Sequence, residues 1–207
     1  MDDAQVKSLS MGLSQKGVRD HNERLILSLI QRHGGLPGSA LAKLADLSPP
    51  TVSGILRQLE SDGLIERGTP VRGKVGKPSI PMGLAANGAF AFGIKIGRRS
   101  ADLMLMDFKG GTRGEMQITY DFPIKQVVLA FLQDGLFNLA EQLSASEQAR
   151  ICGIGIAAPF EFWNWNASID APSNAFQAWR EVDLVAEIGA FSDLPVNVMN
   201  DATAACQ

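Results

Sequence analysis

The sequence has few of the residues that build metal sites or disulfides, and no long apolar run. It holds only 2 Cys and 2 His among 207 residues. Cys152 and Cys206 are isolated, without a Cys-x-x-Cys partner or a His at ligand spacing, so neither a metal site nor a disulfide is indicated. No stretch is apolar enough to span a bilayer, and residues 1–5 lack the features of a secretion signal. We expect a cytoplasmic protein without metal, cofactor or membrane contact.

Composition excludes a disordered or collagen-like chain, since 45% of the residues are hydrophobic and 20% are charged. The net charge of −3 hides an asymmetry. Residues 1–80 carry 11 Lys and Arg against 8 Asp and Glu, whereas residues 81–207 carry 8 against 14. The length suffices for two modest domains, and the charge balance places any nucleic-acid contact in the first of them.

Residues 39–67 have the pattern of two short helices, a tight turn and a strand, which is typical of a winged helix-turn-helix. For the second helix, Ser48 is a suitable N-cap, Pro49 fits the first helical position, and Gly63 ends the run. Its buried stripe is formed by Val52, Ile55, Leu56 and Leu59. With a preceding helix over residues 18–33, we predict a winged helix-turn-helix domain over residues 17–80.

The polar side chains of the second helix fall on its outer face, where they are candidates for DNA contact. Ser and Thr can reach phosphates or base edges, Arg can bind guanine or phosphate, and Gly allows close approach of the backbone. The predicted contacts are Ser48, Thr51, Ser53, Gly54, Arg57 and Gln58. The alternative is a small helical hairpin whose polar face is merely solvated.

A loop over residues 68–79 follows the predicted strand Leu64–Arg67 and is rich in Gly, Pro and positive charge. Its cations Arg72, Lys74 and Lys77, together with Arg67, face no acid nearer in sequence than Glu66. Such a loop can enter a minor groove or hold phosphates. A solvated interdomain linker would have the same composition.

The second domain, residues 89–207, is predicted to be α/β. The expected order is a three-stranded meander, a helix, a buried strand, a helix, a strand and a last helix. The corresponding ranges are residues 90–96, 100–106, 115–120, 124–143, 151–157, 182–191, 196–199 and from 200 onward. This βββαβαβα order fits one lobe of the ribonuclease-H-like fold shared by actin and sugar kinases. The helix over residues 124–143 is expected to bury Val127, Val128, Phe131, Leu132, Leu136, Leu139 and Leu143.

The order and spacing of many short motifs resemble those of the ROK family of repressors, open reading frames and kinases. The matching motifs are Val18-Arg19, Asn22, Leu41-Ala42, Thr51–Ser53, Leu59-Glu60, Gly63-Leu64, Gly76–Pro78, Gly153–Pro159, Trp179, Asp183-Leu184 and Pro195–Ala205. The resemblance implies a winged helix fused to a sugar-kinase-like body. The family's Gly-Glu-x-Gly-His segment, zinc site and second lobe have no counterpart here, so the zinc site is not carried over.

The resemblance also bears on chemistry. Kinase members carry Asp-x-Gly-Gly-Thr where this chain has Lys95, Ile96, Gly97, Arg98 and Arg99, so we do not expect ATP-dependent phosphoryl transfer. The sugar-binding Asn-Asp pair is matched by Asn200 and Asp201, and Ser173 and Asn174 match further sugar contacts. A helix N-cap, with Asp201 as the capping residue, would account for the pair equally well.

The sequence therefore predicts a sugar-responsive transcriptional repressor of carbohydrate uptake or catabolism genes. Its expected partners are a double-stranded DNA operator, a sugar or sugar phosphate effector and a second copy of the chain. The alternatives are a ROK-type sugar kinase and an adaptor that does not bind DNA.

Overall fold

The computed structural model describes residues 15–71, 78–159 and 178–206. The chain forms two compact units, Met1–Ala85 and Ala86–Gln207. Arg72, Lys74, Lys77, Ser173 and Asn174 lie outside the described residues.

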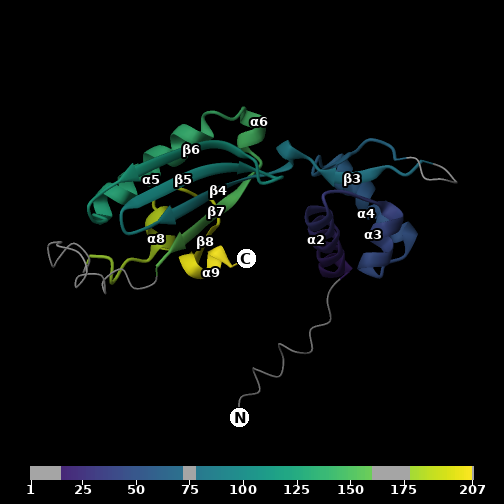
Figure 1. The fold of residues 1–207 in the computed structure, drawn as a ribbon, viewed down its shortest axis with the longest axis horizontal. Helices are drawn as coiled ribbons and strands as arrows, with labels where there is room; N and C mark the ends of the chain where they lie inside the picture. Colours follow the sequence, from purple (N-terminus) through teal and green to yellow (C-terminus); the bar gives the residue numbers. More distant parts are fainter. Residues whose placement is uncertain (1–14, 72–77, 160–177, 207) are drawn as a thin grey trace, which may run out of the picture. The chain divides into compact units, whose positions relative to one another are not determined.

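Among its described residues, the first unit combines three helices with a small antiparallel sheet (Figure 1). Its elements are α2 (Gln15–His33), β1 (Leu36–Pro37), α3 (Gly38–Ala45), α4 (Pro49–Ser61), β2 (Ile65–Arg67) and β3 (Pro81–Leu84). The strand order is β1-β3-β2. The three predicted helices and the strand after them are confirmed, whereas β1 and β3 were not expected from the sequence.

The core of this unit is built from one apolar stripe on each helix. Ile26 and Ile30 on α2, Leu41 on α3, and Val52 and Leu59 on α4 are each at most 1% exposed. Met82 and Leu84 of β3 close this core from the sheet side. Burial of these side chains holds α4 in place while its opposite face stays in solvent.

The ends of α4 follow the capping chemistry that the sequence indicates. The Ser48 hydroxyl oxygen accepts a hydrogen bond from the Thr51 backbone N–H at 3.3 Å. Gly63, just past the helix, has φ +73°, a left-handed conformation that glycine adopts without steric cost. In the turn between α3 and α4, Asp46 adopts the same region with φ 52°. Asp46 thus holds a left-handed backbone conformation that a residue with a side chain adopts less readily than glycine.

The second unit is a five-stranded mixed sheet with helices, in the strand order β6-β5-β4-β7-β8. After a short 3-10 helix (Ala86–Gly88), its elements are β4 (Phe90–Ile96), β5 (Ser100–Asp107), β6 (Thr112–Thr119), α5 (Lys125–Ala140), α6 (Ala145–Gln148), β7 (Ile151–Ala158), α8 (Leu184–Gly189), β8 (Val196–Asn200) and α9 (Asp201–Ala205). The meander β4–β5–β6 is antiparallel, and β4, β7 and β8 run parallel. The predicted order is confirmed, with α6 as an addition.

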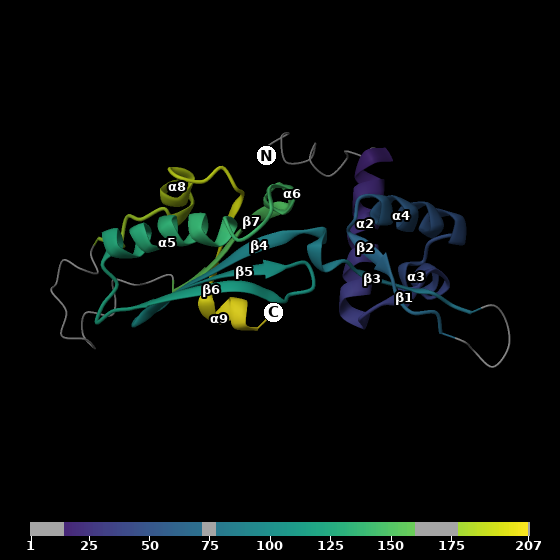
Figure 2. The same ribbon diagram turned by 90° about the horizontal axis from the view of Figure 1, so that it is seen from above.

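The two faces of this sheet differ. Helices α5 and α8 lie over one face, and the short α9 lies on the other (Figure 2). Alternate residues of the strands, such as Phe92, Ile94 and Leu103, are buried beneath α5 and α8. The helix prediction was wrong for Val127, which is 43% exposed, because the helix turns this position away from the sheet.

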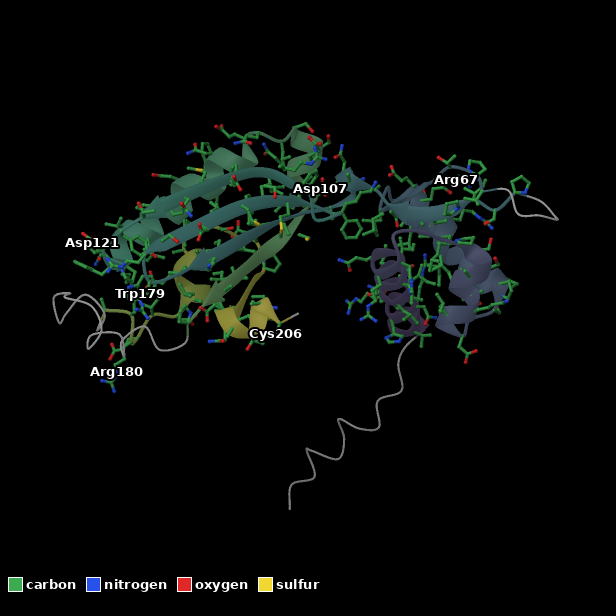
Figure 3. The ribbon with its side chains drawn as sticks, in the orientation of Figure 1. Arg67, Asp107, Asp121, Trp179, Arg180 and Cys206 are labelled. Atoms are coloured by element: carbon green, nitrogen blue, oxygen red, sulfur yellow. The ribbon has the colours of Figure 1, made fainter. Side chains whose placement is uncertain are left out.

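The β5–β6 hairpin is held by a carboxylate. Asp107 accepts hydrogen bonds from the backbone N–H groups of Lys109 and Gly111, each at 2.9 Å, and pairs with Arg113 at 3.0 Å. Burial by itself would raise the pKa of Asp107, but these donors together lower it below its ordinary value. In Figure 3, Asp107 and Asp121 mark opposite ends of β5 and β6. Asp107 thus fixes one end of the meander.

Candidate nucleic-acid interface and effector site

The outer face of α4 is polar and solvent-exposed along its length. Every residue predicted to contact DNA from this helix is exposed: Ser48, Thr51, Ser53, Gly54, Arg57 and Gln58. The Ser48 and Thr51 hydroxyl groups hydrogen-bond each other at 2.8 Å, and the Gln58 amide donates to Asp62 at 2.9 Å. Within the described residues, the Arg57 guanidinium makes no hydrogen bond or ion pair. The helix therefore presents a cation and several hydroxyl and amide groups that packing does not use.

Gly54 stands in the middle of this face. A Cβ atom built on it would meet no atom within 4 Å. The packing of the first unit therefore does not require glycine at this position. Glycine also makes the helix less stable than alanine would.

The loop after β2 is a hairpin that returns to the same unit. β2 pairs with β3, with Arg67 opposite Met82, and an isolated bridge joins Val71 to Ser79. The described residues at both ends of segment 68–79 therefore belong to one sheet of the first unit, which favours the predicted wing over a linker between the two units.

The partner of Arg67 could not be read from the sequence, in which its nearest acid is Glu66. Its guanidinium donates to both carboxylate oxygens of Glu60, at 2.6 and 3.0 Å. This hydrogen bonding lowers the pKa of Glu60 and raises that of Arg67. Sequence reasoning missed the pair because the partners belong to different elements, which only the fold brings together.

The candidate effector residues Asn200 and Asp201 lie at the edge of the sheet where β4, β7 and β8 end. Cross-strand pairing sets Lys95 beside Ala157, and Ala158 beside Asn200. The turn after β4 and the Asn200-Asp201 pair after β8 therefore share one edge. Ligands of open α/β sheets bind at the carboxyl ends of parallel strands.

The turn after β4 is a closed hairpin. The Gly97 N–H donates to the Ser100 carbonyl at 2.8 Å, and the Tyr120 hydroxyl donates to the Gly97 carbonyl at 2.9 Å. Burial, with a smaller contribution from the charge of Asp102, raises the pKa of Tyr120. The Arg99 guanidinium donates to the Asp121 carbonyl at 3.1 Å. This backbone is engaged in closing the turn, and its exposed side chains are cationic.

Asn200 caps α9. Its side-chain oxygen accepts from the backbone N–H groups of Ala202 at 3.1 Å and Thr203 at 3.3 Å. The Asp201 carboxylate accepts from Ala202 at 2.9 Å. The expectation that Asp201 would be the capping residue was wrong: Asn200 has the extended backbone of a cap, and Asp201 begins the helix. Both side chains are half-buried at the sheet edge.

The sheet face that carries α9 is hollowed by a cavity of about 910 Å³. Its polar lining includes Lys95, Asp102, Gln117 and Asn197. Asp102 accepts hydrogen bonds from the Gln117 amide and, at 3.2 Å, from the Ser100 hydroxyl. Sequence reasoning missed Asp102, Gln117 and Asn197, although their alternation with buried strand residues is the signal that places them on this face.

The described residues offer neither a metal site nor a membrane-spanning helix. They contain no group of three or more His, Cys, Asp or Glu side chains placed to hold a metal ion. Among the helices that the structure describes, none has the length and apolarity to cross a membrane.

Known proteins resemble this chain in the winged helix region and over most of its length. A family model described as winged helix-turn-helix DNA-binding matches residues 19–66. A solved structure described as a ROK family transcriptional regulator, homologous to the Escherichia coli MLC protein, matches 91% of this chain and 47% of its own chain, with a TM-score of 0.60 and 22% identity. The chain has the fold of a ROK family regulator. The resemblance noted in the sequence is thereby confirmed.

Two curated relatives are named as a repressor and as a transcriptional regulator. A putative xylose repressor of Caldicellulosiruptor sp. is 27% identical over 90% of this chain and 46% of its own length. The DNA-binding transcriptional dual regulator NagC of Escherichia coli is 25% identical over 65% of this chain and 32% of its own length. The chain thus spans about half the length of the first of these relatives and a third of the second.

Proposed function

We propose that this chain is a transcriptional repressor that binds a double-stranded DNA operator through its winged helix and responds to a sugar. The observation that carries the proposal is the outer face of α4. Its polar residues are exposed and its amino-terminal end is capped by Ser48, within a segment that matches winged helix-turn-helix DNA-binding proteins. Such a helix can lie in a major groove and read base edges.

The proposed contacts of this helix region with bases and phosphates are Ser48, Thr51, Ser53, Gly54, Arg57 and Gln58. The wing residues Arg72, Lys74 and Lys77 are proposed to bind the flanking phosphates. A single winged helix covers few base pairs, so we propose that the chain acts as a homodimer on a roughly palindromic site in the cytoplasm.

The effector is proposed to be a sugar or sugar phosphate bound by Asn200, Asp201, Ser173 and Asn174. Amide and carboxylate groups at the carboxyl edge of a sheet offer acceptors and donors that suit a polyol. Binding would favour an arrangement of the dimer whose recognition helices no longer match the operator spacing. A relative named as a xylose repressor supports control of carbohydrate uptake or catabolism genes.

The proposal assigns no catalytic residue. Lys95 stands where kinase members carry an acid, and it is exposed on β4. A cation there cannot hold the magnesium of a nucleotide as an acid does. Incubation with sugars and ATP tests this directly: ADP production that is lost in Asp201→Asn would instead establish a sugar kinase.

Genome-wide mapping of bound DNA, followed by binding assays on the recovered sites, tests DNA binding. Arg57→Ala should weaken binding and reduce the slope of log K against log salt by about 0.9, the value for one lost phosphate contact. Arg24→Ala, which removes an exposed arginine from α2, is the matched control. Binding that is equally strong in wild type and Arg57→Ala would contradict the proposed interface, and an absence of any DNA binding would favour an adaptor.

A further inference from the structure

The ion pair between Glu60 and Arg67 joins α4, the proposed recognition helix, to the end of β2. Glu60 lies in the last turn of α4, and Arg67 is the last residue of β2. The two guanidinium nitrogens reach the two carboxylate oxygens at 2.6 and 3.0 Å, an arrangement that fixes direction as well as distance. Figure 3 shows Arg67 at the end of β2.

The pair borders a groove of about 420 Å³ lined by α4, the start of α3, and the strands β2 and β3. Ser53 and Arg57 of α4 line the same groove, as does Met82, which stands opposite Arg67 on β3. The exposed side chains of α4 and the end of β2 thus border the same groove. A change in the angle between α4 and the strands β2 and β3 would therefore change the shape of this groove.

The geometry also limits what Arg67 does. Two of its nitrogens already donate to Glu60, and the carboxylate cancels its charge. A phosphate would have to compete with this partner. Arg67 is therefore better placed to hold the wing than to bind DNA.

We propose that Glu60 is a positioning residue for DNA binding: through Arg67 it holds the paired strands β2 and β3 at a fixed angle to α4. This inference rests on the proposed DNA-binding function. Removal of an acid from a DNA-binding surface would ordinarily strengthen binding, because the acid repels phosphate. If Glu60 is a positioning residue, its removal should weaken binding instead.

The test uses the full chain and a duplex selected from a random pool by the wild-type protein, with binding measured by fluorescence anisotropy across a salt series. Glu60→Gln and Arg67→Gln should each weaken binding roughly fivefold or more. The double variant should be no weaker than either single variant, since both lose the same contact. The exchanged pair, Glu60→Arg with Arg67→Glu, should restore binding to within about twofold, and a purely steric role would not give this rescue.

The Arg19–Glu23 pair on α2 provides the matched control. It is likewise an exposed Arg–Glu contact, at 2.8 Å, but it lies within one helix. Glu23→Gln should leave affinity unchanged, and thermal unfolding of Glu60→Gln should match that of Glu23→Gln.

Two results would overturn the inference while leaving the proposed function intact. One is stronger binding by Glu60→Gln together with a salt slope reduced by about 0.9 in Arg67→Gln, which would make Arg67 a phosphate contact. The other is unchanged affinity in both single variants. If the wild-type protein selects no duplex at all, the proposed function and this inference fail together.

Discussion

Replacing Gly54 with alanine should stabilise the protein and impair its binding to DNA. Gly54 lies in the interior of α4 and is exposed, and an added Cβ meets no atom within 4 Å. A glycine in a helix interior is less favourable than alanine by about 1 kcal/mol. Because nothing in the unit clashes with the new methyl group, the variant should recover most of that free energy of folding.

The gain is large enough to measure. For a domain of this size, about 1 kcal/mol corresponds to a rise in Tm of roughly 4–8 °C, provided the first unit unfolds in its own transition. On DNA the same methyl group would stand between the helix backbone and the duplex. Overpacking of a close contact costs about 1–3 kcal/mol, so affinity should fall roughly 5- to 150-fold.

Calorimetry and anisotropy on a selected duplex check the two effects separately. Gly189→Ala in α8 is the control, because an added Cβ there also meets no atom within 4 Å and the position lies in the second unit. It should leave DNA affinity unchanged. A lower Tm for Gly54→Ala would refute the reasoning, because it would mean that the added methyl group does clash with neighbouring atoms. The reasoning is refuted equally if the variant binds DNA as the wild type does.

Four further changes test the local physics. Ser48→Ala removes the cap of α4 and should destabilise the first unit by about 1 kcal/mol in urea unfolding. Asp46→Gly relieves a left-handed conformation and should stabilise the same unit by about 0.5–1 kcal/mol; an unchanged urea midpoint would contradict this. Gly153→Ala places a Cβ 2.9 Å from the backbone oxygen of Pro195, which cannot rotate away, so the second unit should lose about 1–3 kcal/mol, measured by the same method. Asp107→Asn should destabilise at neutral pH. Because the folded-state pKa of Asp107 is lowered, its carboxylate stabilises above the unfolded-state value, so the difference from wild type should shrink as the pH falls below about 4.

Local signals in the sequence were sufficient for most elements of the fold. Ser48, Pro49 and Gly63 mark the ends of α4 because capping is decided by adjacent residues. The apolar stripe of α4 identified its buried face, because residues three or four apart in a helix lie on the same side. The polar residues between them therefore had to lie on the exposed face.

Other features depended on contacts between residues far apart in the chain. The pairing of β2 with β3 and of Val71 with Ser79 places the described ends of segment 68–79 in one sheet, although the composition of the segment suits a linker equally well. Val127 fits an apolar stripe but is turned to solvent, because the sheet contacts only one sector of α5. Asn200 rather than Asp201 caps α9, because β8 extends to Asn200 and sets where the helix begins.

The sequence by itself thus determined the type and approximate bounds of the helices and strands, the polar face of the recognition helix, and the resemblance that relates the chain to ROK regulators. Only the tertiary structure decided that Arg67 binds Glu60 and that the ends of β4 and β8 share one edge. Helix caps and apolar stripes are set by neighbours within a few residues, whereas an ion pair between two elements or a shared sheet edge exists only after the chain has folded.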